Sequence, residues 1–403
     1  MYTIQTNNNY DFKGESYSTY FPNLHRYPAT MLPQIGIELF KELKIKKQKL
    51  LDPYCGTGSS VLAGIADGFL EFHGFDINPL AVLIAKARYT KLNIKKLSVY
   101  RKNLEYTVYY EKEDILPPFI TNIDFWFSKR SIKDLSVIRK SILEEIIDKK
   151  YQALFWVAFS ETVRFVSYTR NSEFKLYRMP EEKRKNFKPN VFDLYFKNLD
   201  KVLNIYINTY RPLIKSQNFK FFSNNFIYKK EKYDVVLTSP PYGDSRTTVA
   251  YGQFSALSNE WIGFPNSRKI DSLLMGGKKA TNLYNKSVIS SYIKKISKSN
   301  EKRALEVSAF YRDLEKSIKE VSQAITNKGF SIYVVGNRTV KNITLPTDQF
   351  IAEQFEKNDF RHILTYKRAI SSKVMPAQNS PTNIAGKKLN TMHEEYIIVC
   401  QKI

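Results

Sequence analysis

Short apolar runs alternate along this chain with segments of helical periodicity. The strand-like runs are KLLDP (49–53), EFHGFD (71–76), YDVVLT (233–238), FSIYVVGN (330–337) and EEYIIVCQK (394–402). Apolar positions of helical spacing follow at 59–69, 79–92 and 304–327. This alternation predicts an α/β fold in which a mostly parallel sheet is covered by helices on both faces. We expect 394–402 to be an antiparallel strand at the edge of that sheet.

The pattern changes in the middle of the chain. Three long segments have helical periodicity: 131–150, 153–168 and 192–210. We therefore predict a mainly helical insertion over 93–217 within an α/β domain formed by 1–92 and 218–403. A second stretch, 243–303, contains no clear strand.

The excess of positive charge in the chain suggests which kind of molecule it binds. The 403 residues carry 63 Lys and Arg against 39 Asp and Glu, a formal net charge of +24. Residues 261–303 hold ten basic side chains and two acidic ones, and 361–393 hold six and none. Concentrated positive charge favours a polyanion such as nucleic acid, because phosphate neutralisation releases counterions. The candidate contacts are Arg268, Lys269, Lys278, Lys279, Lys294, Lys295, Lys298, Arg368 and Lys373.

Other classes are disfavoured by composition. No apolar run approaches the ~18–20 residues of a membrane helix, and the first residues do not resemble a signal peptide. Two cysteines and four histidines cannot build a disulfide scaffold or a four-cysteine zinc site. We expect a cytoplasmic protein without membrane association and without a bound metal.

The segment DPYCGTG (52–58) lies where a strand gives way to a helix. Gly56 and Gly58 permit a tight turn and close approach of a ligand to the backbone. Asp52 at the strand tip suits an ammonium group better than a phosphate. Asp76 ends the next strand, where a carboxylate commonly binds ribose hydroxyls. An amine-binding acid and a ribose-binding acid around a glycine turn favour S-adenosylmethionine over a nucleotide.

The segment TSPPYG (238–243) ends the apolar strand 233–238. Pro240 and Pro241 lack backbone donors and stiffen the turn. Ser239 and the Pro240 carbonyl can therefore both accept hydrogen bonds from one amino group, and Tyr242 offers an aromatic face to a base. These features suit methylation of an amino nitrogen on a nucleobase that has left the duplex.

These segments resemble those of a known family. LLDPYCGTGSS, GFDINPLAV and DVVLTSPPYG are similar to motifs I, II and IV of the S-adenosylmethionine-dependent DNA amino-methyltransferases of restriction–modification systems, which modify cytosine at N4 or adenine at N6. HRYPATMLPQ (25–34) resembles the segment that these enzymes place beside the methionine end of the cofactor. The resemblance covers roughly 15–92 and 218–403. It implies a Rossmann-like class I methyltransferase fold with a seven-stranded sheet.

The resemblance also assigns roles. Asp52 would meet the methionine ammonium beside the turn of Cys55, Gly56, Thr57 and Gly58, and Tyr27 and Pro28, after His25 and Arg26, would lie near the methionine end. Asp76 would hold the ribose, with Ile77 and Asn78 beside the adenosine. Asn224 or Asn225 stands where many relatives have an Asp toward adenine. Ser239, Pro240, Pro241 and Tyr242 would bind the target base.

Several functions remain open from the sequence. Ser at the first position of SPPY favours cytosine N4 over adenine N6. An RNA guanine-N2 methyltransferase shares similar motifs, and a DNA-binding module without catalysis would not need both acidic strand tips. Methylation at cytosine C5 needs a cysteine after a proline, whereas Cys55 follows Tyr54 and Cys400 falls within a strand. The resemblance implies double-stranded DNA as partner and a cognate restriction endonuclease on a separate chain; oligomeric state is open. The resemblance also makes 1–92 and 218–403 the catalytic domain. The insertion 93–217 is then a candidate for DNA binding or target recognition, and 243–303 is expected to be a basic DNA-contacting segment of the catalytic domain.

Overall fold

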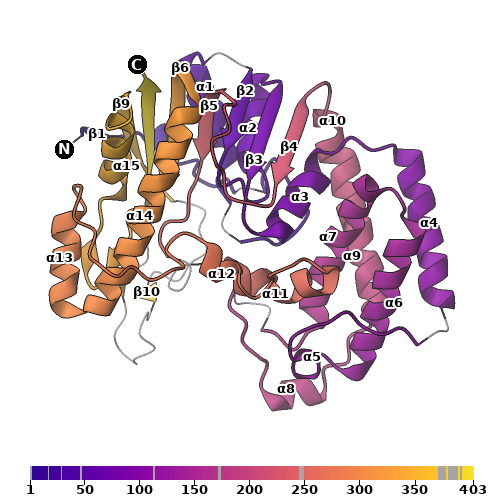
Figure 1. The fold of residues 1–403 in the computed structure, drawn as a ribbon. Helices are drawn as coiled ribbons and strands as arrows, with labels where there is room; N and C mark the ends of the chain where they lie inside the picture. The colour runs from indigo at the N-terminus through magenta and orange to yellow at the C-terminus, as the bar shows by residue number, and fades with distance from the viewer. Residues whose placement is uncertain are drawn as a thin grey trace.

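The structure is a computed structural model that describes residues 2–16, 18–28, 30–45, 48–111, 114–170, 174–244, 249–370, 378–379, 389–390 and 393–403. Its centre is an eight-stranded sheet (Figure 1). In spatial order the strands are β1 (Ile4–Thr6), β9 (Phe360–Ala369), β12 (Glu394–Lys402), β6 (Ile325–Val335), β5 (Tyr233–Thr238), β2 (Lys49–Asp52), β3 (Glu71–Phe75) and β4 (Asn218–Phe222). β6, β5, β2, β3 and β4 run parallel, so their carboxyl ends meet at one edge.

The predicted Rossmann-like α/β fold is confirmed, but the predicted edge position of 394–402 is wrong. β12 is antiparallel and lies between β6 and β9, pairing with both. Its residues Ile397 to Cys400 are buried, and an apolar strand at an edge would leave a row of backbone groups without partners. The sheet also has one more strand than expected, because the short β1 pairs in parallel with β9.

Helices cover both faces of the sheet. One face carries α1 (Pro33–Leu43), α2 (Ser59–Asp67) and α3 (Pro79–Tyr89), and the other carries α14 (Glu301–Ala324) and α15 (Thr347–Glu356). Val235 and Leu237 of β5 belong to the first hydrophobic cluster, and Val236 belongs to the second. A strand buried on both faces has an uninterrupted apolar sequence, which is why this strand was predicted with its observed bounds.

The predicted insertion is largely helical and lies beside the β4 edge of the sheet (Figure 1). Its helices are α4 (Ile94–Tyr110), α5 (Ile123–Trp126), α6 (Lys129–Glu145), α7 (Lys149–Val166), α8 (Glu181–Lys185) and α9 (Val191–Ile205), which continues through the π-helical turn Tyr206–Tyr210 into α10 (Arg211–Leu213). α7 packs against α3, and both belong to one hydrophobic cluster. The insertion therefore shares its core with the eight-stranded sheet.

The stretch 243–303 forms helices where it is described. They are α11 (Tyr251–Ile262), α12 (Ile270–Leu273) and α13 (Ser290–Ser299). α11 packs on α7 and α3, whereas α13 packs on α14. The small elements are η1 (Asn8–Tyr10), β7 (Thr339–Val340), β8 (Ile343–Thr344), β10 (Gln378–Asn379) and β11 (Leu389–Asn390). Within the described part of the chain, every helix is too short or too polar to cross a membrane.

Candidate active site

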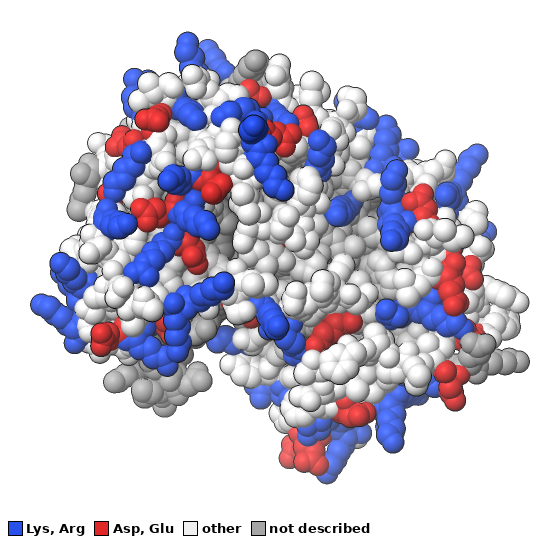
Figure 2. Space-filling model, viewed as in Figure 1, with Lys and Arg blue, Asp and Glu red and all other residues white. Residues whose placement is uncertain are grey.

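A cavity of about 940 Å³ lies at the carboxyl ends of the central strands. The predicted site residues that line it are Tyr27, Gly56, Asp76, Ile77, Asn224, Asn225, Ser239 and Pro241. They follow four different strands or precede α1, and the parallel sheet brings them to one edge. Figure 2 shows the hollowed centre of this face, with Lys and Arg side chains and some acidic ones around it.

Asp52 connects the tips of β2 and β5 through Thr238, and although Pro53 and Tyr54 line the cavity, Asp52 itself does not. It is 3% exposed, and its carboxylate accepts hydrogen bonds from the Thr238 hydroxyl (2.5 Å), the Ser60 hydroxyl (2.5 Å) and the Tyr54 N–H (3.0 Å). Burial raises the pKa of Asp52 to about 6, although these hydrogen bonds act in the opposite direction. Because Thr238 immediately precedes Ser239, Asp52 fixes the start of the SPPY turn as well as the glycine turn.

The raised pKa of Asp52 predicts a gain in stability when the charge is removed. The carboxyl loses its proton near pH 4 in the unfolded chain and near pH 6 in the folded one. The wild-type free energy of unfolding should therefore fall as pH rises through this window, since only the unfolded state has then lost the proton. Asp52→Asn has no proton to lose there, and we expect it to be about 1–2 kcal/mol more stable than wild type at pH 7.

Urea unfolding at pH 4 and pH 7 measures this difference. The exposed Glu38 of α1, which pairs with Lys41, provides the control; Glu38→Gln should change the free energy of unfolding by less than about 0.5 kcal/mol at either pH. An Asp52→Asn variant that is less stable than wild type at pH 7 would show that the hydrogen bonds to the carboxylate outweigh its burial.

Asp76 and the glycine turn form the wall beside β3. The Asp76 carboxylate accepts hydrogen bonds from the N–H groups of Gly56 (3.0 Å) and Asn78 (2.8 Å), and burial raises its pKa to about 6. Gly56 has φ 49°, and a Cβ added there would meet no atom within 4 Å. The turn is thus open toward the cavity. An acid beside an open backbone turn fits the ribose and methionine parts of S-adenosylmethionine.

The turn is held from behind by α3, which the sequence did not reveal. Gly58 has φ 85°, and a Cβ there would lie 2.7 Å from the Tyr89 ring. The Tyr89 hydroxyl donates to the Gly58 carbonyl (2.5 Å), and the buried Arg88 donates to the Thr57 carbonyl (2.8 Å). Arg88 in turn stacks on Tyr210 of the insertion, 4.8 Å from the ring centroid. Thr57 and Gly58 therefore face α3 and do not line the cavity.

Asn78 also has a structural position. It caps α3 by accepting from the Leu80 N–H, as predicted, but its amide donates to the hydroxyls of Tyr27 (2.9 Å) and Ser255 (2.9 Å). It is 1% exposed and lies outside the cavity wall. Asn78 therefore does not face the cavity, but it fixes Tyr27, which lines the cavity and stacks on Tyr251 of α11. Pro28 is buried next to Tyr27.

The SPPY turn presents Ser239 and Pro241 to the cavity. Tyr242 does not line this cavity; it lines a small separate hollow together with Phe310 and Arg338. The Tyr242 hydroxyl donates to Glu395 of β12 (2.9 Å) and accepts from Ser239 (3.3 Å). Stacking of a base on Tyr242 remains a prediction.

Part of the wall comes from elements that sequence reasoning did not connect with the site. Tyr251, Phe264 and Met275 belong to the α11–α12 region, and polar residues of α14 face the cavity: Asp313, Lys316, Ser317 and Glu320. Their spacing of three and four residues places them on one helical face, so the sequence could have predicted a polar face on this helix. The Gly276 N–H donates to Asp313 (2.8 Å) and so joins the segment after α12 to α14.

The predicted DNA contacts differ in their surroundings. Three of them are exposed near α12, with Lys278 on the cavity wall: Lys269, Lys278 and Lys279. Three others are exposed on α13, which lies apart from α12 (Figure 1): Lys294, Lys295 and Lys298. Arg268 pairs with Glu260 (2.8 Å). The prediction is wrong for Arg368, which is 2% exposed and pairs with Glu395. Lys373 lies outside the described residues.

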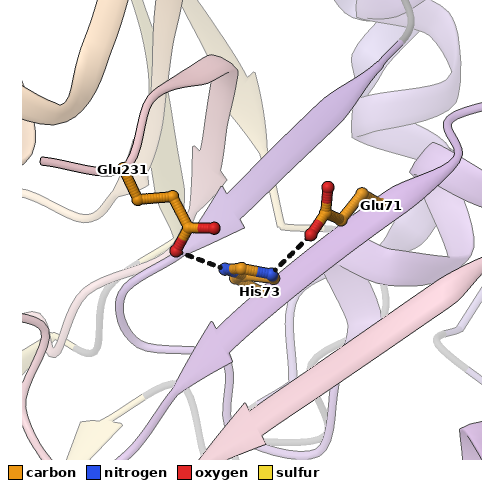
Figure 3. A group of neighbouring side chains, drawn as sticks. All are labelled: Glu71, His73 and Glu231. Atoms are coloured by element: carbon orange, nitrogen blue, oxygen red, sulfur yellow. Dashed lines mark hydrogen bonds and ion pairs between the residues drawn. The ribbon is translucent and has the colours of Figure 1, made fainter.

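A second polar cluster lies at the opposite ends of these strands. Glu71 and Glu231 flank the two ring nitrogens of the buried His73, at 2.9 and 3.2 Å (Figure 3). The Lys49 ammonium lies 2.5 Å from Glu231 and 3.5 Å from Glu71. The carboxylates thus approach opposite sides of the ring and share an ammonium. We interpret this cluster as an ion network that joins the amino ends of β2, β3 and β5.

Neither cysteine is placed as a nucleophile. Cys55 and Cys400 are both buried, and burial raises the pKa of each thiol well above its usual value. A thiol that stays protonated is a poor nucleophile. This agrees with the sequence argument against methylation at cytosine C5.

The strand order, the acidic tips of β2 and β3 and the proline turn after β5 together define an S-adenosylmethionine-dependent methyltransferase. No family model matches the sequence. In an alignment of 412 positions that covers 93% of this chain and 89% of the relative, the chain is 41% identical to the type II methyltransferase M.MvaI of Kocuria varians. It therefore belongs to the type II methyltransferases, the modification enzymes of restriction–modification systems, and its cofactor is S-adenosylmethionine.

Solved structures of other methyltransferases are more distant. The rRNA methyltransferase aviRa from Streptomyces viridochromogenes aligns at 8% identity over 93% of this chain and 87% of its own, with a TM-score of 0.30. An S-adenosylmethionine-dependent methyltransferase from Clostridium acetobutylicum ATCC 824 aligns at 8% identity over 92% and 90%, with a TM-score of 0.31. Scores this low carry no argument about this chain.

Proposed function

We propose that this enzyme transfers a methyl group from S-adenosylmethionine to the exocyclic N4 of a cytosine extruded from duplex DNA, within a specific sequence. One observation carries the proposal: Asp76 and Ser239, which end different strands, line one cavity, and Asp52 hydrogen-bonds the residue before Ser239. A cofactor held at Asp76 would thus lie beside the group that receives the base. The cavity volume of about 940 Å³ is at the upper end for small-molecule sites, which leaves room for a base beside the cofactor.

The residues of the SPPY turn suit an amino-group substrate. Pro240 and Pro241 have no N–H, so the backbone offers carbonyl acceptors there. Ser239 adds a hydroxyl oxygen on the cavity wall. S-adenosylmethionine supplies an electrophilic methyl group on its sulfonium. The protein's part is to hold the amino group through acceptors, exclude water and orient the base.

DNA binding is supported by the exposed basic residues near the cavity. Lys278 lies on the cavity wall, and Lys269 and Lys279 are exposed close to α12, whose Ile270, Ser272 and Leu273 line the same wall. The phosphates next to an extruded base would pass this side. Binding through phosphates weakens steeply with salt. The relative M.MvaI is a type II methyltransferase, which supports the modification of a defined site and the existence of a matching restriction endonuclease on a separate chain.

The nature of the product decides between the candidate functions. The protein is incubated with labelled S-adenosylmethionine and duplex DNA, and the DNA is digested to nucleosides and analysed by mass spectrometry. We expect N4-methylcytosine. N6-methyladenine would show that the target base is adenine and not cytosine. Label found only in RNA would contradict methylation of DNA. Omission of DNA, and a duplex methylated beforehand by the same enzyme, serve as controls.

A further inference from the structure

A chain of hydrogen bonds runs from the buried Arg368 to Ser239 at the cavity. The Arg368 guanidinium donates to Glu395 through Nη1 (2.5 Å) and to the carbonyls of Tyr10 (2.6 Å) and Asp11 (3.3 Å) through Nε and Nη2. Arg368 and Glu395 are paired across β9 and β12. Glu395 accepts from the Tyr242 hydroxyl at its other oxygen (2.9 Å), and Tyr242 accepts from the Ser239 hydroxyl (3.3 Å).

The charged groups Arg368 and Glu395 fix which way each hydroxyl proton points in this series of hydrogen bonds. An arginine can only donate hydrogen bonds, and an ionised carboxylate can only accept them. The Tyr242 proton must therefore point to Glu395, so the Tyr242 oxygen is left to accept. The Ser239 proton then points to Tyr242, and the lone pairs of Ser239 remain for a group in the cavity.

We infer that Glu395, held by Arg368, is a positioning residue that keeps Ser239 a hydrogen-bond acceptor toward the target amino group. The inference rests on the proposed function, because it concerns how Ser239 receives an NH₂ group. It gives Arg368, expected from the sequence to contact DNA, a role inside the protein. It also explains why β12 carries an acid at the end nearest the SPPY turn.

Glu395→Gln tests the direction of the chain. Because Arg368 only donates, the new amide oxygen should turn to it, and the amide NH₂ should face Tyr242. Tyr242 would then accept from the glutamine and donate to Ser239, whose proton would turn toward the substrate amino group. We expect the single-turnover rate of methyl transfer to fall on the order of tenfold, with the Kd values for S-adenosylmethionine and DNA within twofold of wild type.

A double variant separates this role from support of the sheet. In Tyr242→Phe the chain is already interrupted, so adding Glu395→Gln should change the transfer rate by less than about twofold. An equal loss from Glu395→Gln in both backgrounds would overturn the inference and leave Glu395 a purely structural residue. An unchanged rate in Glu395→Gln alone would overturn it as well. Glu394→Gln is the matched control, since Glu394 is the neighbouring acid on β12, is exposed and pairs with Lys367 (2.8 Å); its rate should equal that of wild type.

If Glu395→Gln does not fold, Tyr242→Phe alone tests whether the Tyr242 hydroxyl orients Ser239, because this variant keeps the Arg368–Glu395 pair intact. It should slow methyl transfer without changing the Kd for S-adenosylmethionine, and a wild-type rate would overturn the inference. Failure of the proposed function would show differently, as an unexpected methylated product from the wild-type enzyme. The ratios between variants do not depend on which base carries the methyl group.

Discussion

Replacing Asp76 with alanine is expected to weaken the binding of S-adenosylmethionine on the order of a hundredfold. The carboxylate lies on the cavity wall and already orders the turn by accepting from the Gly56 and Asn78 N–H groups. The variant would lose both an acceptor for the ribose hydroxyls and the group that holds the glycine turn. Isothermal titration with the cofactor, in the absence of DNA, measures the effect.

The wild-type protein provides a second measurement on the same residue. Because burial raises the pKa of Asp76 to about 6, cofactor affinity should decrease as pH falls through this value. The amide of Asp76→Asn does not titrate in this range, so the cofactor affinity of this variant should depend less on pH than that of wild type. Asp200→Ala is the control, since Asp200 is an exposed acid that pairs with Arg101 on the insertion, and it should bind the cofactor as wild type does. Wild-type affinity in Asp76→Ala would show that the cofactor does not bind at this acid.

Asp244→Ala is expected to lower the free energy of unfolding by about 3–5 kcal/mol. Asp244 directly follows the SPPYG segment, is 1% exposed and accepts from Arg303 (2.8 Å) and Arg338 (2.8 Å). Burial alone would raise its pKa, but Arg338 and Arg303 outweigh burial and lower the pKa to about 2. Removing the carboxylate would leave two guanidinium groups side by side in a largely buried site.

Urea unfolding at pH 7 measures this loss. The rate of methyl transfer should fall with it, because Asp244 anchors the end of the SPPY turn to α14 through Arg303. Glu181→Ala is the matched control: Glu181 pairs with Lys185 on the surface of α8, and such exposed pairs contribute about 0.5 kcal/mol or less. Equal losses in the two variants would contradict the anchoring role of Asp244. Since the pKa of Asp244 is lowered, its stabilising effect should disappear as pH falls from about 4 toward 2.

The sequence predicted the parts of the fold whose signal is local. The runs at 49–53, 71–76 and 233–238 were recognised because buried parallel strands are continuously apolar, and the observed strands agree within a residue or so. β9 was missed, because its mixed sequence FRHILTYKRA lacks that pattern. The position of β12 could not be predicted either: strand order depends on which neighbours complete its backbone hydrogen bonds.

The sequence by itself predicted the type of reaction, since acidic strand tips, a glycine turn and a proline turn indicate a methyltransferase site. Only the tertiary structure decided which of these residues face the ligand space. Asp76 and Ser239 line the cavity, whereas Asn78, Thr57 and Arg368 look equally polar in the sequence and are used inside the protein. The physical reason is that a buried polar group must find a partner, and those partners, on α3, α11 and β12, are far away along the chain.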